Sequence, residues 1–241
     1  MGAIAEDAKS AVAANNIANV NTTGFKSDLA VVRARLAEAE EKGLGALATP
    51  LDAIGGGAIV AETRTSFAQG PMTQTNKPLD LAIYGDGFFH VTDGSNEYYT
   101  RAGSFVRDGA GRIATGDGKA FLCDHSGRPI TVPVDGELTI SGDGTISVGD
   151  ATVGKIDLVN FSNLKALEKV GANLYANRGA SVEANGTGQI KQGMLEASNI
   201  SPVDWLAKMI AASRGYEMNM QLIRMQDQTL SELVGIGRIT I

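Results

Sequence analysis

The side chains that most often carry out catalysis are scarce in this chain of 241 residues, which has two histidines, His90 and His125, and one cysteine, Cys123. Cys123 follows two apolar residues and has no evident base, so we expect a small core residue rather than a nucleophile. His90 stands in an alternating run typical of a strand, and we expect it at the surface or lightly buried. Neither histidine has a cysteine or carboxylate at a spacing typical of metal ligands. These patterns predict that the protein is not an enzyme and binds no metal.

Loops rich in glycine and aspartate could instead bind a cation or a phosphate group. Asp135, Asp143 and Asp150 resemble one irregular copy of a calcium-binding loop, but aspartates that form turns are the more common case. Residues 55–57 and 116–119 are glycine-rich yet lack the complete glycine and Lys-Ser/Thr pattern of a phosphate loop. We therefore expect turns at these places and no cofactor.

Side-chain amides are concentrated near the N-terminus, in the run ANNIANVNTTGFK at residues 14–26. Asparagine disfavours helices because its amide competes for backbone groups, so these amides are expected to bond to a neighbouring chain or backbone. Gly24 suits the left-handed position after a helix, with the next residue folding back on that helix. The alternative is a capped helix end without a partner. The sequence predicts an assembly contact made by Asn15, Asn16, Ile17, Asn19, Asn21, Gly24 and Phe25.

The C-terminal region has the clearest helix signals. Ser201 is a good N-cap, Pro202 suits the first helical position, and Asp204 lies near the positive end of the helix dipole. A helix over residues 202–234 would be about 50 Å long. Steps of three and four residues place apolar side chains along it, as in a coiled-coil seam, although an ordinary core helix is the alternative. The predicted contact residues are Leu206, Met209, Tyr216, Met220, Ile223, Leu230 and Val234.

Between these ends the chain is typical of β-structure, because 25 of its 30 glycines lie between residues 43 and 193. Residues 81–84 and 88–91 are typical of two strands joined by the tight turn at 85–87. Further hairpin signals follow at residues 108–113, 143–146 and 186–190.

These patterns predict an α+β fold in which N- and C-terminal helices form an α-helical coiled-coil layer around a central antiparallel, curled β-domain. The expected parts are an N-terminal helical segment at residues 1–42, a Gly-rich connector at 43–57, the β-domain at 58–193 and a coiled-coil helix at 194–241. Within the first part, a helix over residues 4–20 is followed by a short helix over 27–42.

Charge and hydropathy exclude several classes of partner. The net charge is −6, so we expect no nucleic acid, which needs a basic face. No apolar run approaches the ~18 residues of a membrane span, so no direct membrane insertion is expected. Glu6, Asp7 and Lys9 stand where a secretory signal peptide would be apolar.

Four motifs follow one another along the chain: ANNIANVNTTGFK at residues 14–26, LDLAIYGDGFF at 79–89, YTRAGSF at 99–105 and GMLEASNIS at 193–201. In this order they resemble the bacterial flagellar basal-body rod and hook family. The modest length resembles the rod members more than the hook protein. Residues 26–29 look more like the proximal rod members than the distal ones.

The resemblance implies a structural subunit whose terminal helices pair around a central channel, forming a hollow axial drive shaft and export channel. It implies that the partners are other rod subunits, proximal and distal, and further copies of the chain itself. It also implies export by the flagellar type III apparatus without a cleaved signal peptide, and a place in the periplasm-spanning rod of the basal body.

Other functions remain open at this point. The chain could be a distal rod subunit of the same family. A β-rich hydrolase would need a nucleophile, a base and an orienting group, for which two histidines and one cysteine give no set. A binding module that dimerises through its helices would form a closed dimer, whereas a rod subunit would stack in an open helical array.

Overall fold

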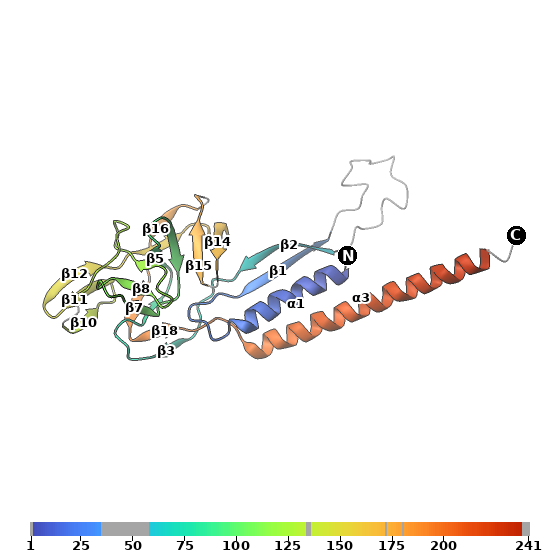
Figure 1. Ribbon diagram of the computed structural model, residues 1–241, viewed down its shortest axis with the longest axis horizontal. Coiled ribbons are helices and arrows are strands. Elements are labelled where there is room, and N and C mark those ends of the chain that lie inside the picture. Colours follow the sequence, from blue (N-terminus) through green and yellow to red (C-terminus); the bar gives the residue numbers. More distant parts are fainter. Residues whose placement is uncertain (1, 35–57, 134–135, 172, 180, 238–241) are drawn as a thin grey trace. The chain divides into compact units, whose positions relative to one another are not determined.

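The computed structural model describes residues 2–34, 58–133, 136–171, 173–179 and 181–237 (Figure 1). The chain divides into two compact units. We call the first the helical unit, which comprises Met1–Ala18, Asp28–Arg64 and Ser201–Ile241. The second is the sheet unit, which comprises Asn19–Ser27 and Thr65–Ile200. None of the described helices is long and apolar enough to cross a membrane.

Two helices and a two-stranded ribbon form the helical unit. Helix α1 (Gly2–Ala18) lies beside the first half of α3 (Pro202–Gly237), and strand β1 (Asp28–Ala34) pairs with β2 (Ala58–Thr65) (Figure 1). The two helices are antiparallel, because Gly2 lies next to Asn219 and Glu6 next to Gly215. They approach closely: a Cβ on Gly215 would lie 3.1 Å from Cγ of Glu6. The C-terminal helix predicted from residue 202 is confirmed.

The predicted coiled-coil layer around the β-domain is wrong. The described residues form two α-helices, and most of the remaining structure is antiparallel β-sheet. One physical reason is length, because α1 has only 17 residues and reaches no further along α3 than about Asn219. Residues 221–232 of α3 are all exposed.

The short helix predicted over residues 27–42 is also wrong where it is described, since β1 occupies Asp28–Ala34. The run Leu-Ala-Val-Val within it favours a strand, because β-branched side chains fit a pleated surface better than a helix. The strand β2, with which β1 pairs, lies outside residues 27–42. The periodicity of those residues alone could therefore not reveal the pairing. Residues 35–42 and the predicted connector at 43–57 lie outside the described residues.

The sheet unit consists of short antiparallel strands. In order they are β3 (Met72–Gln74), β4 (Leu81–Tyr84), β5 (Phe88–Thr92), β6 (Glu97–Thr100), β7 (Phe105–Arg107), β8 (Ile113–Thr115), β9 (Phe121–Leu122), β10 (Leu138–Ile140), β11 (Thr145–Val148), β12 (Ala151–Lys155), β13 (Leu158–Phe161), the 3-10 helix η2 (Leu164–Ala166), β14 (Leu167–Val170), β15 (Leu174–Asn177), β16 (Glu183–Asn185), β17 (Gln189–Gln192) and β18 (Met194–Glu196).

The largest sheet has the order β14-β15-β6-β5-β9-β8-β7, with β13 pairing with β5 and β16. Separate sheets pair β10-β11-β12, β17-β4 and β18-β3. Strand β5 is buried on both faces, and its alternating side chains enter two cores. Phe88 joins an aromatic cluster with Tyr99 and Tyr175, whereas Phe89 and Val91 join an aliphatic cluster.

Candidate assembly site

Asn16 joins α1 to the start of β1 inside the helical unit. Its side chain is fully buried. The amide Nδ2 donates to the carbonyl oxygen of Asp28 at 2.7 Å, and Oδ1 accepts from the Asp28 amide at 2.9 Å. This predicted contact residue therefore bonds within its own chain. The other predicted residues of the block are less buried: Ile17 and Asn19 are half-buried, and Asn15 and Asn21 are exposed.

Gly24 and Phe25 belong to the sheet unit. Gly24 has the predicted left-handed conformation, with φ +65°, and its amide donates to the Glu196 carbonyl at 2.8 Å. A Cβ there would lie 2.3 Å from the Ala102 nitrogen, so only glycine fits. Gly24 is not the residue that ends α1, however, because that helix ends at residue 18. Phe25 is buried, with the ammonium of Lys169 3.9 Å from its ring centroid.

A buried cluster of three charged side chains follows directly. Lys26, Glu196 and Arg101 are 1%, 0% and 5% exposed. Glu196 Oε1 accepts from Lys26 Nζ at 2.5 Å and from the Gly70 amide at 2.8 Å. Lys26 Nζ also donates to the Ala68 carbonyl at 2.8 Å, and Arg101 Nη1 lies 3.5 Å from Glu196 Oε2. One carboxylate thus joins segments from four parts of the sequence.

The electrostatics of this cluster depend on Glu196. Burial lowers the pKa of Lys26, the neighbouring Glu196 carboxylate acts in the opposite direction, and the Arg101 charge lowers it further. Burial likewise lowers the pKa of Arg101, and Glu196 opposes that effect. The Arg101 guanidinium also lies 5.2 Å from the centroid of the Phe88 ring. Two cations therefore share one carboxylate, and that carboxylate stabilises both.

Asn199, which follows Glu196 by three residues, connects further parts of the sheet unit by hydrogen bonds. Its Oδ1 accepts from the Ser27 amide at 2.8 Å, and its Nδ2 donates to the carbonyls of Ser66 and Ala68 at 2.9 and 3.0 Å. The approach is close enough that a Cβ on Gly70 would lie 2.1 Å from the Ala197 oxygen. Segments 24–27, 66–70 and 196–199 form one hydrogen-bonded junction.

Sequence reasoning missed the charged cluster. Lys26, Arg101 and Glu196 each lie in a different one of the quoted motifs, at residues 14–26, 99–105 and 193–201. A single charged residue in each of three motifs whose other residues are all uncharged is the signal that could have indicated a shared buried partner.

The predicted contact residues of α3 lie mostly at the surface of the helical unit. Those with the most exposed side chains are Leu206, Tyr216, Ile223 and Leu230, at 48%, 39%, 41% and 61%, whereas Met209 and Met220 are half-buried. The side chain of Val234 lies outside the described residues. Trp205 and Ala212 are buried instead. The covered face of α3 therefore includes residue 205 and not the predicted residue 206.

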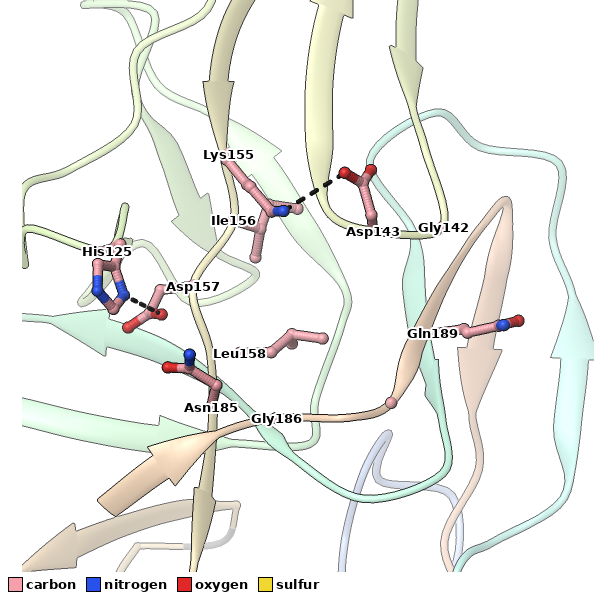
Figure 2. Close-up of a pocket in the computed structure, with 11 residues that line it drawn as sticks. His125, Gly142, Asp143, Lys155, Ile156, Asp157, Leu158, Asn185, Gly186 and Gln189 are labelled. Atoms are coloured by element: carbon pink, nitrogen blue, oxygen red, sulfur yellow. Dashed lines mark hydrogen bonds and ion pairs between the residues drawn. The ribbon is translucent and has the colours of Figure 1, made fainter.

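A cleft of the described sheet unit, with a volume of about 870 Å³, is lined by charged side chains among others. Figure 2 shows His125 reaching Asp157 at one side and Lys155 reaching Asp143 at the other, at 3.2 and 3.4 Å. The second oxygen of Asp157 lies 3.2 Å from Nδ1 of His90. Burial raises the pKa of Asp157, but its hydrogen bonds to the two imidazoles outweigh burial and hold the pKa below its usual value.

This cleft has no set of groups for catalysis among the described residues. Cys123 is fully buried, and burial raises the pKa of its thiol to about 12, which keeps the thiol protonated at neutral pH. His90 is 6% exposed, more deeply buried than predicted. Asp143 bonds to the amide and hydroxyl of Thr145, as expected of a turn aspartate, and Asp135 lies outside the described residues. No three His, Cys, Asp or Glu side chains of the described part are placed to hold a metal ion.

Comparison with protein families gives three matches along the chain. Residues 1–26 match a family described as flagella basal body rod protein. Residues 82–148 match the D1 domain of the flagellar hook protein FlgE/F/G, and residues 191–236 match the flagellar basal body rod FlgEFG protein C-terminal region. The first and third matches include Lys26 and Glu196 of the charged cluster, and the second includes Arg101.

Individual relatives match over nearly the whole length. The flagellar basal-body rod protein FlgG of Bacillus subtilis is 38% identical over 94% of this chain and 92% of its own. FlgF of Caulobacter vibrioides is 40% identical over 90% of this chain and 86% of its own. FlgG of the same Caulobacter is 36% identical over 95% of this chain and 94% of its own.

Proposed function

The chain belongs to the flagellar basal-body rod protein family and is a structural subunit of the basal body rather than an enzyme, and from this premise we propose that it is a proximal rod subunit. Two observations support the proximal assignment. Residues 26–29 resemble proximal members, and the FlgF relative is 40% identical. The distal alternative is supported by the 38% identity to FlgG of Bacillus over 94% of the chain.

The test of this assignment is to delete the gene in the host bacterium and image the basal bodies that remain. Loss of the proximal part of the rod, together with the distal part that builds on it, is expected for a proximal subunit. A rod that keeps its proximal part and lacks only the distal part would contradict the proximal assignment and favour the distal one.

We further propose that the chain joins other rod subunits, and copies of itself, through its terminal helices. The observation that supports this most strongly is the exposure of large apolar side chains on α3, including Ile223 and Leu230 at 41% and 61%. Exposed apolar surface of this extent is typical of interaction sites. Asn15 and Asn21 of the N-terminal block are also exposed.

The experiment replaces Ile223 and Leu230 with glutamine. Incorporation of this variant into basal bodies is compared with that of a control variant carrying Gln221→Ala and Gln228→Ala on the same helix. We expect the first variant to be absent from isolated basal bodies and the second to be incorporated. Both should keep the far-ultraviolet circular dichroism of the parent. Incorporation of the Ile223 and Leu230 variant at the parent level would contradict the proposal.

Export by the flagellar type III apparatus is also proposed, as the family membership suggests. In a strain without that apparatus, we expect the chain to remain in the cytoplasm. Its appearance outside the cytoplasm in such a strain would contradict export by this route.

A further inference from the structure

Helix α3 has a second apolar stripe that α1 cannot cover. Met218, Leu222 and Met225 follow one another at steps of four and three residues and are 63%, 57% and 58% exposed. At about 100° per residue, Met218, Leu222 and Met225 lie about 120°, 80° and 140° around the helix axis from Ala212, which is buried in the helical unit. The stripe therefore lies on a flank of α3, away from Ala212.

The same unit contains a groove between α1, β1 and α3. It has a volume of about 340 Å³, roughly ten times the ~30 Å³ of a water molecule in the liquid. Small or short apolar side chains line it, among them Val12, Ala30 and Ala211. Beside them Leu29 is 42% exposed. A groove of this size and chemistry suits large, flexible apolar side chains.

Charges on the two surfaces are complementary. The groove is lined by Lys9, Lys208 and Glu6, and Glu6 is already paired with Lys9 at 2.7 Å. This leaves the charge of Lys208 in excess. Residues 214–232 of α3, which include the stripe, have three carboxylates, from Glu217, Asp227 and Glu232, and two guanidiniums, from Arg214 and Arg224. Their net negative charge is opposite in sign to the excess charge of the groove.

We propose that the groove of one subunit receives Met218, Leu222 and Met225 from α3 of a second copy of this chain. The inference rests on the proposed function, since it specifies one contact of the assembly. The two surfaces differ, so the contact is head-to-tail and extends into an open stack instead of closing into a dimer. Methionine suits such a contact because its flexible side chain adapts to neighbours that differ slightly.

Cysteine cross-linking in the assembled rod tests the contact. Cells express two tagged copies, one with Ala211→Cys and the other with Met225→Cys, and isolated basal bodies are oxidised. The control replaces Met225→Cys with Asp227→Cys, which lies about 200° away around α3. Because a disulfide requires Cα atoms within about 7 Å, we expect at least ~10-fold more mixed dimer from the first pair. The native Cys123 is buried and is present in both experiments.

Two results would overturn the inference while leaving the proposed function intact. They are equal yields from the two pairs in basal bodies that contain both copies, and linkage of Met225→Cys only to a protein of another mass. Absence of both copies from basal bodies would overturn the proposed function and this contact with it.

A second variant tests the groove without cysteines. Ala211→Trp fills the groove, whereas Ala207→Trp adds the same side chain at an exposed position of α3 that does not line it. We expect at least ~10-fold less incorporation of the first variant than of the second, as for the loss of an interface anchor. Equal incorporation of the two would contradict the contact.

Discussion

Replacing Glu196 with glutamine should strongly destabilise the sheet unit. The substitution keeps the shape of the side chain but deprives Lys26 and Arg101, 1% and 5% exposed, of the carboxylate that they share. Removing one partner of a buried ion pair costs about 3–5 kcal/mol. At about 2–4 °C per kcal/mol for a protein of this size, the melting temperature should fall by roughly 6–20 °C.

The control is Glu168→Gln, which also removes one negative charge from the sheet unit. Glu168 pairs with Arg178, but their side chains are 53% and 73% exposed, so this pair contributes at most about 1 kcal/mol. Tyrosine circular dichroism in the near ultraviolet follows the sheet unit, because Tyr99 and Tyr175 lie in its aromatic cluster. Melting curves of the parent and both variants give the comparison.

Lys26→Met provides a second, asymmetric test. It removes one of two cations and leaves Arg101 to pair with Glu196, so its cost should be clearly smaller than that of Glu196→Gln. The carboxylate does not stabilise both cations if Glu196→Gln lowers the free energy of unfolding by less than about 1 kcal/mol, or if Lys26→Met lowers it more than Glu196→Gln does. Either result would refute the electrostatic account of the cluster.

Three further substitutions test the packing and hydrogen bonds described above. Gly103→Ala should prevent native folding of the sheet unit, since its Cβ would lie 1.6 Å from the Leu81 oxygen, whereas Gly154→Ala, 4.0 Å from its nearest neighbour, should fold; circular dichroism distinguishes them. Asn16→Leu should lower the unfolding free energy of the helical unit by about 1–3 kcal/mol in urea titrations, because two backbone groups lose their partner; an unchanged value would contradict this. Asp157→Asn should be less stable than the parent at neutral pH, and the difference should narrow as the pH falls below ~4, because a carboxylate with a lowered pKa loses its stabilising effect when protonated; a difference independent of pH would contradict it.

Features set by neighbouring residues could be predicted from the sequence. The hairpin signals at residues 108–113 and 143–146 are confirmed by the pairings β7–β8 and β10–β11. The C-terminal helix likewise begins where its cap and proline indicate. In each case the interactions that decide the structure lie within a few residues of one another. The strands on either side of the signal at 186–190, β16 and β17, do not pair with each other.

Pairings between distant segments could not be predicted in this way. The strands at residues 81–84 and 88–91 exist, but the predicted hairpin between them is wrong, because β4 pairs with β17 about 100 residues later. Gly85 and Gly87, at φ +97° and +135°, instead carry the chain from one sheet to another. A local turn pattern does not distinguish these outcomes, since both need glycine with positive φ.

The site shows the same limit. The left-handed conformation of Gly24 followed from its position in the motif, but its close neighbours are at Arg101 and Ala102. The partner of Lys26 is 170 residues away. A single sequence can show one charge in an otherwise uncharged motif, whereas the carboxylate that compensates that charge is found only in three dimensions.

The bond between Lys26 and Glu196 also constrains the order of folding. It closes a loop of 170 residues, and contacts between such distant residues form slowly because the chain must first lose the entropy of the whole loop. In a polypeptide that emerges with its N-terminus first, Lys26 and Arg101 are present long before Glu196. Their burial is unfavourable during that interval, so the junction stays open until the last fifth of the chain arrives. The subunit thereby delays completion of its own core until the C-terminal helix is about to follow.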